Sequence, residues 1–264
     1  MMQQLQPALD LDVFFARVHA ASSRVLMLDY DGTLAPFHED PAQARPYPGI
    51  PALLDTIIQT GQTRLVIVSG RWIKSLIPLL GLKAMPEIWG SYGWERSSPN
   101  GDYSSAPVQA SAFEALATAE QWVADIERLG ARCERKPTAL AFHWRGLAKE
   151  RVVEIHSRIL EKWTRLAVER ELGWHDFDGG IEFRARGWDK GEAVKAILTE
   201  SGPGAVCAYL GDDLDDEHAF KAIPDSGLSV LVREQFRPTA ADLWIQPPEE
   251  VREFLARWQR ACAR

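Results

Sequence analysis

Cysteine is scarce in this chain, and the few cysteines are far apart. Cys133, Cys207 and Cys262 form no C-x-x-C pair in a sequence of 264 residues. They fit neither a disulfide framework nor a zinc site, and they favour a reducing, cytoplasmic compartment. The first ten residues lack the basic-then-apolar pattern of a signal peptide, and the longest apolar runs are too short to span a bilayer.

Basic residues are also in short supply. Thirty Lys and Arg against 37 Asp and Glu give a net charge of −7, and no stretch is strongly basic. This balance argues against a nucleic-acid or membrane partner, so an anionic substrate would need a local cluster of cations. There is no Walker loop and no G-x-G-x-x-G after an apolar run, which disfavours P-loop and dinucleotide-binding enzymes.

The periodic segments that are present predict an α/β protein with an insertion. Buried-strand and helix patterns alternate up to about residue 106 and again from residue 186, as in a parallel sheet flanked by helices. We therefore predict a Rossmann-like core formed by residues 1–106 and 186–264. The predicted strands are 25–28, 64–68, 87–89, 205–210 and 227–232, and a helix capped by Asp189 precedes the last two.

The intervening residues, 107–185, follow a different rhythm. One long helix is predicted over 111–129 and a second over 148–163. Residues 138–145 place the large apolar Leu140, Phe142 and Trp144 on one face and Ala141, His143 and Arg145 on the other, as in a half-buried strand. Residues 166–169 and 181–185 also resemble strands. This part of the chain is predicted to be a small α+β insert.

The most informative motif follows the first predicted strand. Residues 29–34 read Asp-Tyr-Asp-Gly-Thr-Leu, so a buried strand would end in two carboxylates and a turn. Asp29 could act as a nucleophile, and Asp31 could donate or accept a proton. Both also offer hard oxygen ligands for Mg²⁺. Alone, the motif could be an ordinary polar turn, so its weight depends on what accompanies it.

Three more polar clusters lie where a predicted strand ends or a helix begins. Ser69 follows the second strand, and Lys190 begins the helix after the insert. The third cluster follows a late strand and contains Asp212, Asp213 and Asp216. Ligands bind beyond the carboxyl ends of strands in open α/β sheets, so the topology brings the strand-end clusters to one rim.

The acidic cluster alone could be a favourable helix N-terminus or a calcium loop. The calcium-loop interpretation fails because the sixth position counted from Asp213 is His218, where an EF-hand requires glycine.

Together the clusters suit phosphoryl transfer. Asp29 would attack phosphorus to form an aspartyl phosphate, while Asp31 would protonate the leaving oxygen and later deprotonate water. Ser69 and Lys190 would hold the phosphoryl oxygens. Mg²⁺ would bridge Asp29, Asp212 and a phosphate oxygen.

The four clusters resemble the four motifs of the haloacid dehalogenase superfamily of phosphatases, and the insert resembles its C2-type cap. The likeness narrows to the trehalose-phosphatase family and spans about residues 24–232. It rests on LDYDGTL (28–34), SGR (69–71), FHWR (142–145), IEFR (181–184), KGEA (190–193) and GDD (211–213). The resemblance implies an Mg²⁺-dependent phosphatase that acts on trehalose 6-phosphate.

The resemblance also implies roles for individual residues. Asp29 would be the nucleophile, and Asp31 the acid/base whose backbone carbonyl also reaches the metal. Asp212 would be the side-chain metal ligand, supported by Asp213 and Asp216. Substrate contacts are implied for Ser69, Gly70, Arg71, Glu95, His143, Arg145, Glu182 and Lys190. For His143 and Arg145, a solvated sheet face is an equally good interpretation.

Two departures from the family pattern concern the leaving-group pocket. Residues 90–95 read Gly-Ser-Tyr-Gly-Trp-Glu, with Tyr92 where the family usually has histidine. Tyrosine keeps a hydrogen-bonding tip but is longer and does not titrate near neutral pH. Arg184-Ala185 replaces the usual basic residue and proline. We expect the chemistry to survive both changes.

Several alternatives stay open at this point. The substrate could be another phosphorylated disaccharide, a pseudo-disaccharide or a glycosyl-phosphoglycerate. A phospho-accepting receiver-like domain is disfavoured by the insert and the late acidic cluster, and a non-catalytic sugar-phosphate binder would not need both Asp29 and Asp31. We expect a monomer whose partner is a small-molecule sugar phosphate, with a sugar-phosphate synthase as a candidate pathway partner.

Overall fold

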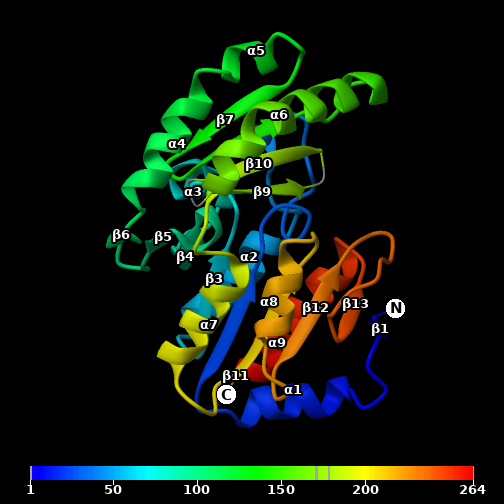
Figure 1. Ribbon diagram of the computed structural model, residues 1–264. Helices are drawn as coiled ribbons and strands as arrows, with labels where there is room; N and C mark the ends of the chain where they lie inside the picture. The colour runs from blue at the N-terminus through cyan, green and yellow to red at the C-terminus, as the bar shows by residue number, and fades with distance from the viewer. Residues whose placement is uncertain (1, 170–171, 178, 264) are drawn as a thin grey trace. The chain divides into compact units, whose positions relative to one another are not determined.

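The computed structural model describes residues 2–169, 172–177 and 179–263, which form two units (Figure 1). The first unit contains the chain up to Ser105 and from Asp189 onward, and the second is Ala106–Trp188. The predicted insert, residues 107–185, lies inside the second unit. None of the helices in the described residues is both long enough and apolar enough to cross a membrane.

A mostly parallel sheet forms the centre of the first unit, which confirms the predicted Rossmann-like core. Its parallel strands, in spatial order, are β13 (Leu243–Ile245), β12 (Leu228–Val232), β11 (Val206–Gly211), β2 (Arg24–Leu28), β3 (Arg64–Val68) and β4 (Glu87–Gly90). Antiparallel strands extend both edges: β1 (Gln3–Gln4) beside β13, and the hairpin β5 (Glu95–Ser97) and β6 (Tyr103–Ser105) beside β4.

Helices cover both faces of this sheet (Figure 1). One face packs against α1 (Leu11–Ala20), α2 (Ile50–Gln59), α3 (Ile73–Leu80) and α9 (Glu249–Cys262). The other face packs against α7 (Lys190–Ser201) and α8 (Asp216–Ala222). Two short 3₁₀ turns, η1 (Pro41–Gln43) and η2 (Ser91–Gly93), lie in the loops that follow β2 and β4.

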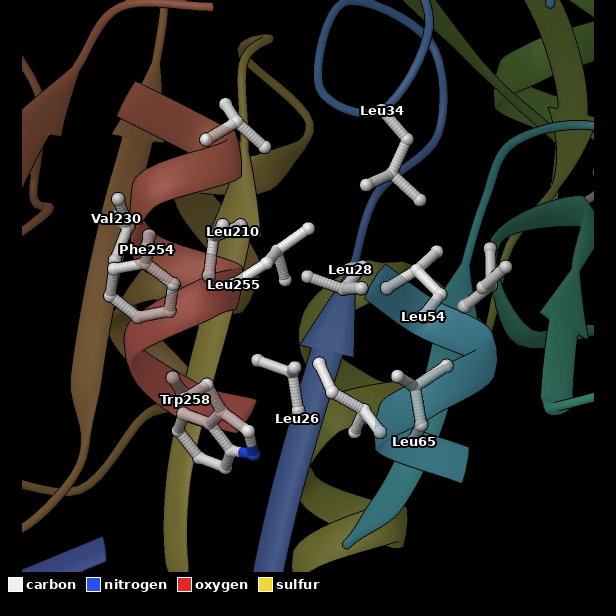
Figure 2. Packing of buried hydrophobic residues seen from close by; sticks show 14 of the residues in the cluster. Leu26, Leu28, Leu34, Leu54, Leu65, Leu210, Val230, Phe254, Leu255 and Trp258 are labelled. Carbon is white, nitrogen blue, oxygen red and sulfur yellow. The ribbon is translucent and has the colours of Figure 1, made fainter. Parts of the chain in front are cut away.

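Burial explains why the central strands are mostly apolar. All five residues of β2 are buried, as expected where helices cover both faces of a parallel sheet. Leu26 and Leu28 of β2 lie in the same apolar cluster as Phe254 and Trp258 of α9 (Figure 2). This packing fixes β2 and β11 side by side, and the proposed catalytic motifs follow directly from their carboxyl ends.

The second unit contains an antiparallel sheet with helices on one face. The strand order is β7 (Arg132–Lys136), β8 (Ala139–His143), β10 (Gly180–Ala185) and β9 (Leu172–Phe177). The helices are α4 (Ala110–Glu120), α5 (Val123–Glu127) and α6 (Lys149–Glu169). Trp163 of α6 packs on Phe142 and Phe183, with ring centroids 4.8 and 5.1 Å apart. Residues of the opposite sheet face include Glu134, Lys136, His143, Glu182 and Arg184.

Two predicted elements of this unit are wrong. Residues 166–169 belong to α6 rather than to a strand, because Leu166 continues the helical spacing of Ile159 and Trp163. The strand begins at Leu172 instead. The predicted helix 111–129 is two helices, α4 and α5. No glycine or proline marks the break, which coincides with contacts that Lys162 of α6 makes with Asp125 and with the Trp122 ring.

Candidate active site

The turn after β2 and the turn after β11 touch each other. The Asp29 N–H donates to the Leu210 carbonyl at 2.8 Å, extending the β2–β11 pairing into the motif. Gly32 has φ +77°, and a Cβ built there would lie 2.1 Å from Asp212 Oδ2. Only glycine fits at this position, because the Asp212 carboxylate lies against its α-carbon.

Lys190 joins the two carboxylate clusters. Its Nζ lies 2.8 Å from Asp29 Oδ1 and 2.8 Å from Asp216 Oδ1, and its side chain is buried. Lys190 is in the first turn of α7, which Asp189 caps by accepting the Glu192 N–H at 2.8 Å. The predicted cap is confirmed. It fixes the helix start and therefore the position of the ammonium group.

Asp216 organises the turn after β11. One of its oxygens accepts hydrogen bonds from Lys190 and from the Tyr209 hydroxyl, the latter at 2.5 Å. The other oxygen accepts the N–H groups of Asp212 and Asp213 at 3.0 and 2.9 Å. Because four donors already occupy Asp216, its contacts favour a positioning role, and Asp29 and Asp212 have more capacity for a ligand.

The cluster carries more negative charge than Lys190 can balance. Burial and the nearby Asp216 raise the pKa of Asp29 to about 7, against the opposing effect of Lys190. Burial and the charge of Asp29 also raise the pKa of Asp212 well above its ordinary value. Burial would lower the pKa of Lys190, but the charges of Asp216 and Asp29 outweigh it and hold that pKa well above its usual range. A further cation would relieve this repulsion.

The acidic residues fit a hard divalent cation. Carboxylate oxygens of Asp29, Asp212 and Asp216 lie within 4.8 Å of one another, and all three residues are buried. Asp212 Oδ1 has no hydrogen-bond partner among the described residues. An orphaned, buried carboxylate oxygen in an oxygen-only site is what Mg²⁺ would complete. This group does not include Asp31 or Asp213, and a metal role for them stays a prediction.

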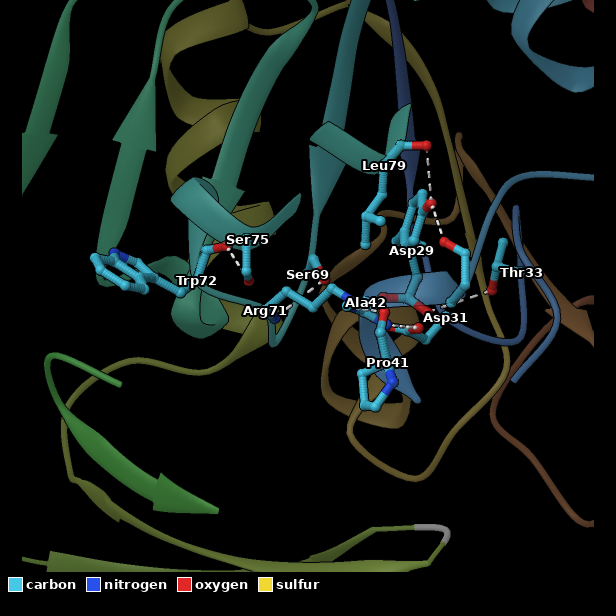
Figure 3. A network of polar contacts seen from close by, with 12 residues as sticks. Asp29, Asp31, Thr33, Pro41, Ala42, Ser69, Arg71, Trp72, Ser75 and Leu79 are labelled. Atoms are coloured by element: carbon cyan, nitrogen blue, oxygen red, sulfur yellow. Dashed lines mark hydrogen bonds and ion pairs between the residues drawn. The ribbon is translucent and has the colours of Figure 1, made fainter. Parts of the chain in front are cut away.

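A second network joins Asp31 to the turn after β3 (Figure 3). The Arg71 guanidinium donates to both oxygens of Asp31, at 2.6 and 2.7 Å, and to the Pro41 carbonyl at 2.9 Å. The Arg71 N–H donates to Ser69 Oγ at 3.1 Å. Arginine is suited to this two-pronged contact, which fixes the direction of the Asp31 carboxylate.

Tyr92 and Glu95 support the turn after β3 from the loop that follows β4. The Tyr92 N–H donates to the Ser69 carbonyl at 3.0 Å, and a Cβ on Gly70 would lie 2.6 Å from the Tyr92 ring. Ser91 and Tyr92 both have positive φ, a strained conformation typical of functional sites. The Glu95 carboxylate accepts Ser91 Oγ at 2.6 Å and the Tyr103 hydroxyl at 2.8 Å. These contacts favour a positioning role for Glu95.

The remaining predicted residues lie in the second unit. Glu182 is buried and accepts Lys136 Nζ at 2.7 Å through one oxygen, while the other oxygen has no hydrogen-bond partner within the described chain. His143 lies 3.1 Å from Glu134, and the Arg145 side chain lies against Gly179. Their substrate roles stay predictions.

Sequence reasoning missed two polar side chains of the core site. Tyr209 holds Asp216, and Thr33 Oγ1 donates to Asp29 Oδ2 at 3.4 Å. Thr33 lies within the first motif and could have been included from its position alone. Tyr209 could have been found because it places a hydroxyl on an otherwise apolar, fully buried strand. A buried hydroxyl requires a hydrogen-bond partner.

Known structures share this fold. The C-terminal domain of the Candida albicans trehalose-6-phosphate phosphatase superposes with a TM-score of 0.79 at 21% identity, covering 98% of this chain and 99% of that one. A haloacid dehalogenase-like hydrolase from Bacteroides thetaiotaomicron gives 0.59 at 17% identity, covering 89% and 99%. At such identities the likeness concerns the fold, which is that of the haloacid dehalogenase-like hydrolases.

Sequence comparison then defines the family. The trehalose-phosphatase family profile matches residues 27–243, so the chain belongs to the trehalose-phosphatase family. It is 32% identical over 247 residues to the trehalose-phosphate phosphatase of Mycobacterium marinum and 31% identical over 255 residues to that of Mycobacterium tuberculosis. These alignments cover 88% and 91% of this chain but only 60% and 62% of those relatives.

Proposed function

We propose that this chain is an Mg²⁺-dependent phosphatase that hydrolyses trehalose 6-phosphate to trehalose and inorganic phosphate. The observation that carries the proposal is the buried contact of Lys190 with Asp29 beside the orphaned carboxylate oxygen of Asp212. Such a site combines a nucleophile with two sources of positive charge, Lys190 and the Mg²⁺ that we propose binds there. Membership of the trehalose-phosphatase family supports the choice of substrate.

The proposed reaction uses two carboxylates in sequence. Asp29 attacks phosphorus, the bond from phosphorus to the sugar oxygen breaks, and an aspartyl phosphate forms. Asp31 gives a proton to the departing sugar oxygen and then takes one from the water that hydrolyses the aspartyl phosphate, restoring Asp29 and releasing phosphate. Lys190 and Ser69 bind the phosphoryl oxygens. Mg²⁺, held by Asp29 and Asp212, would neutralise charge on the phosphoryl group.

The identity of the sugar needs a separate test, because Tyr92 stands where the family usually has histidine and its ring lies beside Gly70. A panel of sugar phosphates tests it directly. We expect the highest kcat/KM for trehalose 6-phosphate among phosphorylated disaccharides, glycosyl-phosphoglycerate and hexose phosphates. A clear preference for another member of the panel would transfer the assignment to that substrate.

The covalent mechanism is tested with Asp29→Asn, which keeps the shape of the side chain but removes the anionic nucleophile. We expect phosphate release to fall by at least about 1,000-fold, as for other catalytic nucleophiles. Asp225→Asn, in an exposed turn, is the matched control and should keep full activity. Chelation of divalent cations should abolish turnover by the wild-type chain, and added Mg²⁺ should restore it. Substantial turnover by purified Asp29→Asn would rule the mechanism out.

A further inference from the structure

The loop after β12 holds the turn that carries Asp212. Arg237 Nη2 donates to the carbonyl of Asp213 at 2.7 Å and to that of Asp212 at 3.3 Å. Arg233 Nη1 donates to the same Asp212 carbonyl at 3.3 Å. Arg233 and Arg237 lie 21 and 25 residues from Asp212 in sequence, so these contacts exist only in the folded chain.

Arg237 is itself fixed by a second set of contacts. Its Nη1 donates to Glu217 Oε1, in the first turn of α8. Glu217 also accepts the Thr239 hydroxyl at 2.8 Å and the Ala240 N–H at 2.8 Å. The guanidinium therefore joins three parts of the chain: the turn after β11, the start of α8 and the loop after β12.

These contacts hold the backbone carbonyl of Asp212, which Asp216 does not contact. Asp216 accepts the Asp212 N–H, and the two arginines hold the Asp212 carbonyl. The backbone of Asp212 is thereby restrained on both sides of its α-carbon.

We propose that Arg237 is a positioning residue that holds Asp212 in the geometry needed to bind a divalent cation. The inference rests on the proposed function only in assuming that Asp212 binds Mg²⁺. Groups that orient metal ligands without touching the metal typically change its affinity by about 10- to 100-fold when they are removed.

A purely electrostatic role makes the opposite prediction, which allows a sharp test. The positive charge of Arg237 repels a cation, so its removal alone would tighten Mg²⁺ binding. Positioning predicts weaker binding, because the Asp212 turn would lose its support. Arg237→Lys separates the two effects: lysine keeps the charge, but its single ammonium group cannot reproduce the planar fork that reaches Glu217 and both carbonyls.

The experiment is calorimetric titration of the full-length chain with Mg²⁺ alone, which needs no turnover. We expect the Kd for Mg²⁺ to rise about tenfold or more in both Arg237→Gln and Arg237→Lys. Arg257→Gln, which removes an arginine that pairs with exposed Asp12, is the matched control and should bind as the wild type does. Asp212→Asn should bind no Mg²⁺ at this site.

Thermal unfolding of each variant separates loss of positioning from loss of fold. If Arg237→Gln does not fold, Mg²⁺ binding by Arg237→Lys and Glu217→Gln tests the same contacts of Arg237 with the Asp212 turn. Unchanged or tighter Mg²⁺ binding by folded Arg237 variants would overturn the proposal, and so would the absence of Mg²⁺ binding by the wild type. Failure to hydrolyse trehalose 6-phosphate would leave the calorimetric result intact, so the two proposals fail separately.

Discussion

At the scale of single residues, Asp31, the proposed proton donor, has its carboxylate already oriented by Arg71. Both of its oxygens accept hydrogen bonds from Arg71, so the carboxylate has a fixed direction but acts only as an acceptor. To protonate a leaving group, Asp31 must carry a proton, and its contact with Arg71 must weaken. An anionic phosphate is a natural competitor for the guanidinium, which would link substrate binding to release of Asp31.

Replacing Asp31 tests the proton-transfer step. Asp31→Asn should lower kcat for trehalose 6-phosphate by about 100-fold or more, because a sugar hydroxyl is a poor leaving group without a proton. A nitrophenyl phosphate has a good leaving group and should lose much less. The measurement is kcat for both substrates with the same enzyme preparations, and equal losses would exclude the acid role of Asp31.

Most residues of the candidate site could be predicted from the sequence. The positions of Asp29, Ser69 and Asp212 at the ends of strands predicted a common rim. Lys190, which the sequence placed at the start of a helix, contacts Asp29 and Asp216 in the structure. Arg237 was not predictable, because an arginine in a polar loop carries no local signal of its partners. Its role depends on hydrogen bonds to backbone carbonyls, which sequence patterns do not reveal.

At the scale of elements, buried strands were predictable and edge strands were not. The strands β2, β3, β11 and β12 are almost entirely apolar because both sheet faces are covered. By contrast, β1 has two residues and β13 has three, too few for a periodic pattern. Such strands exist because a neighbouring strand offers hydrogen bonds, so tertiary context decides them.

An ion pair between Arg64 and Glu87 also joins β3 to β4, at the ends of the strands away from the candidate site. Arg64 begins β3 and donates to both oxygens of Glu87, each at 2.9 Å, and Glu87 begins β4. Burial would raise the pKa of Glu87, but the hydrogen bonds from Arg64 and Trp89 outweigh it and lower that pKa below its ordinary value of 4.5. The charged form is therefore favoured in the folded state.

The Arg64–Glu87 pair gives the free energy of unfolding a defined pH dependence. A lowered folded-state pKa contributes stability above the unfolded value of 4.5 and loses it as pH falls through the folded value. Glu87→Gln should lower the free energy of unfolding by about 1–3 kcal/mol at neutral pH. The difference from the wild type should shrink in acid, and denaturant titrations at neutral and acidic pH measure it.

The matched control is Glu249→Gln, which removes an exposed pair with Arg252. It should change stability little at either pH, because exposed pairs contribute little. Glu87→Gln should also leave kcat unchanged when the variant is folded. A stability difference from the wild type that is the same at both pH values would show that the Glu87 charge is not involved.

At the scale of the whole molecule, the chain divides its polar chemistry between two units. The first unit holds the proposed nucleophile, acid and metal ligands, and the second holds the buried pair of Lys136 and Glu182. Burial would lower the pKa of Lys136, but the charge of Glu182 outweighs it and raises that pKa. We propose that Glu182 binds a sugar hydroxyl through its unpartnered oxygen, so that selectivity and chemistry reside in different units.

Removal of Glu182 should therefore change selectivity without changing the chemistry. Glu182→Ala should lower kcat/KM for trehalose 6-phosphate by about 10- to 100-fold, the cost of one or two lost hydrogen bonds to a charged group. Hydrolysis of a small aryl phosphate should be unaffected, because it has no sugar to recognise. The ratio of the two kcat/KM values is the measurement.

A structural role for Glu182 would produce part of the same result, because Glu182→Ala leaves Lys136 buried and unpaired. That change alone can destabilise a fold by about 3–5 kcal/mol. The double variant Lys136→Met with Glu182→Leu removes both charges and replaces them with apolar side chains, which usually restores stability. If Glu182 binds the sugar, this variant regains its melting temperature but not its activity on trehalose 6-phosphate. If sugar-phosphate hydrolysis returns together with stability, Glu182 only supports the sheet of the second unit, and sugar recognition must be assigned to other residues.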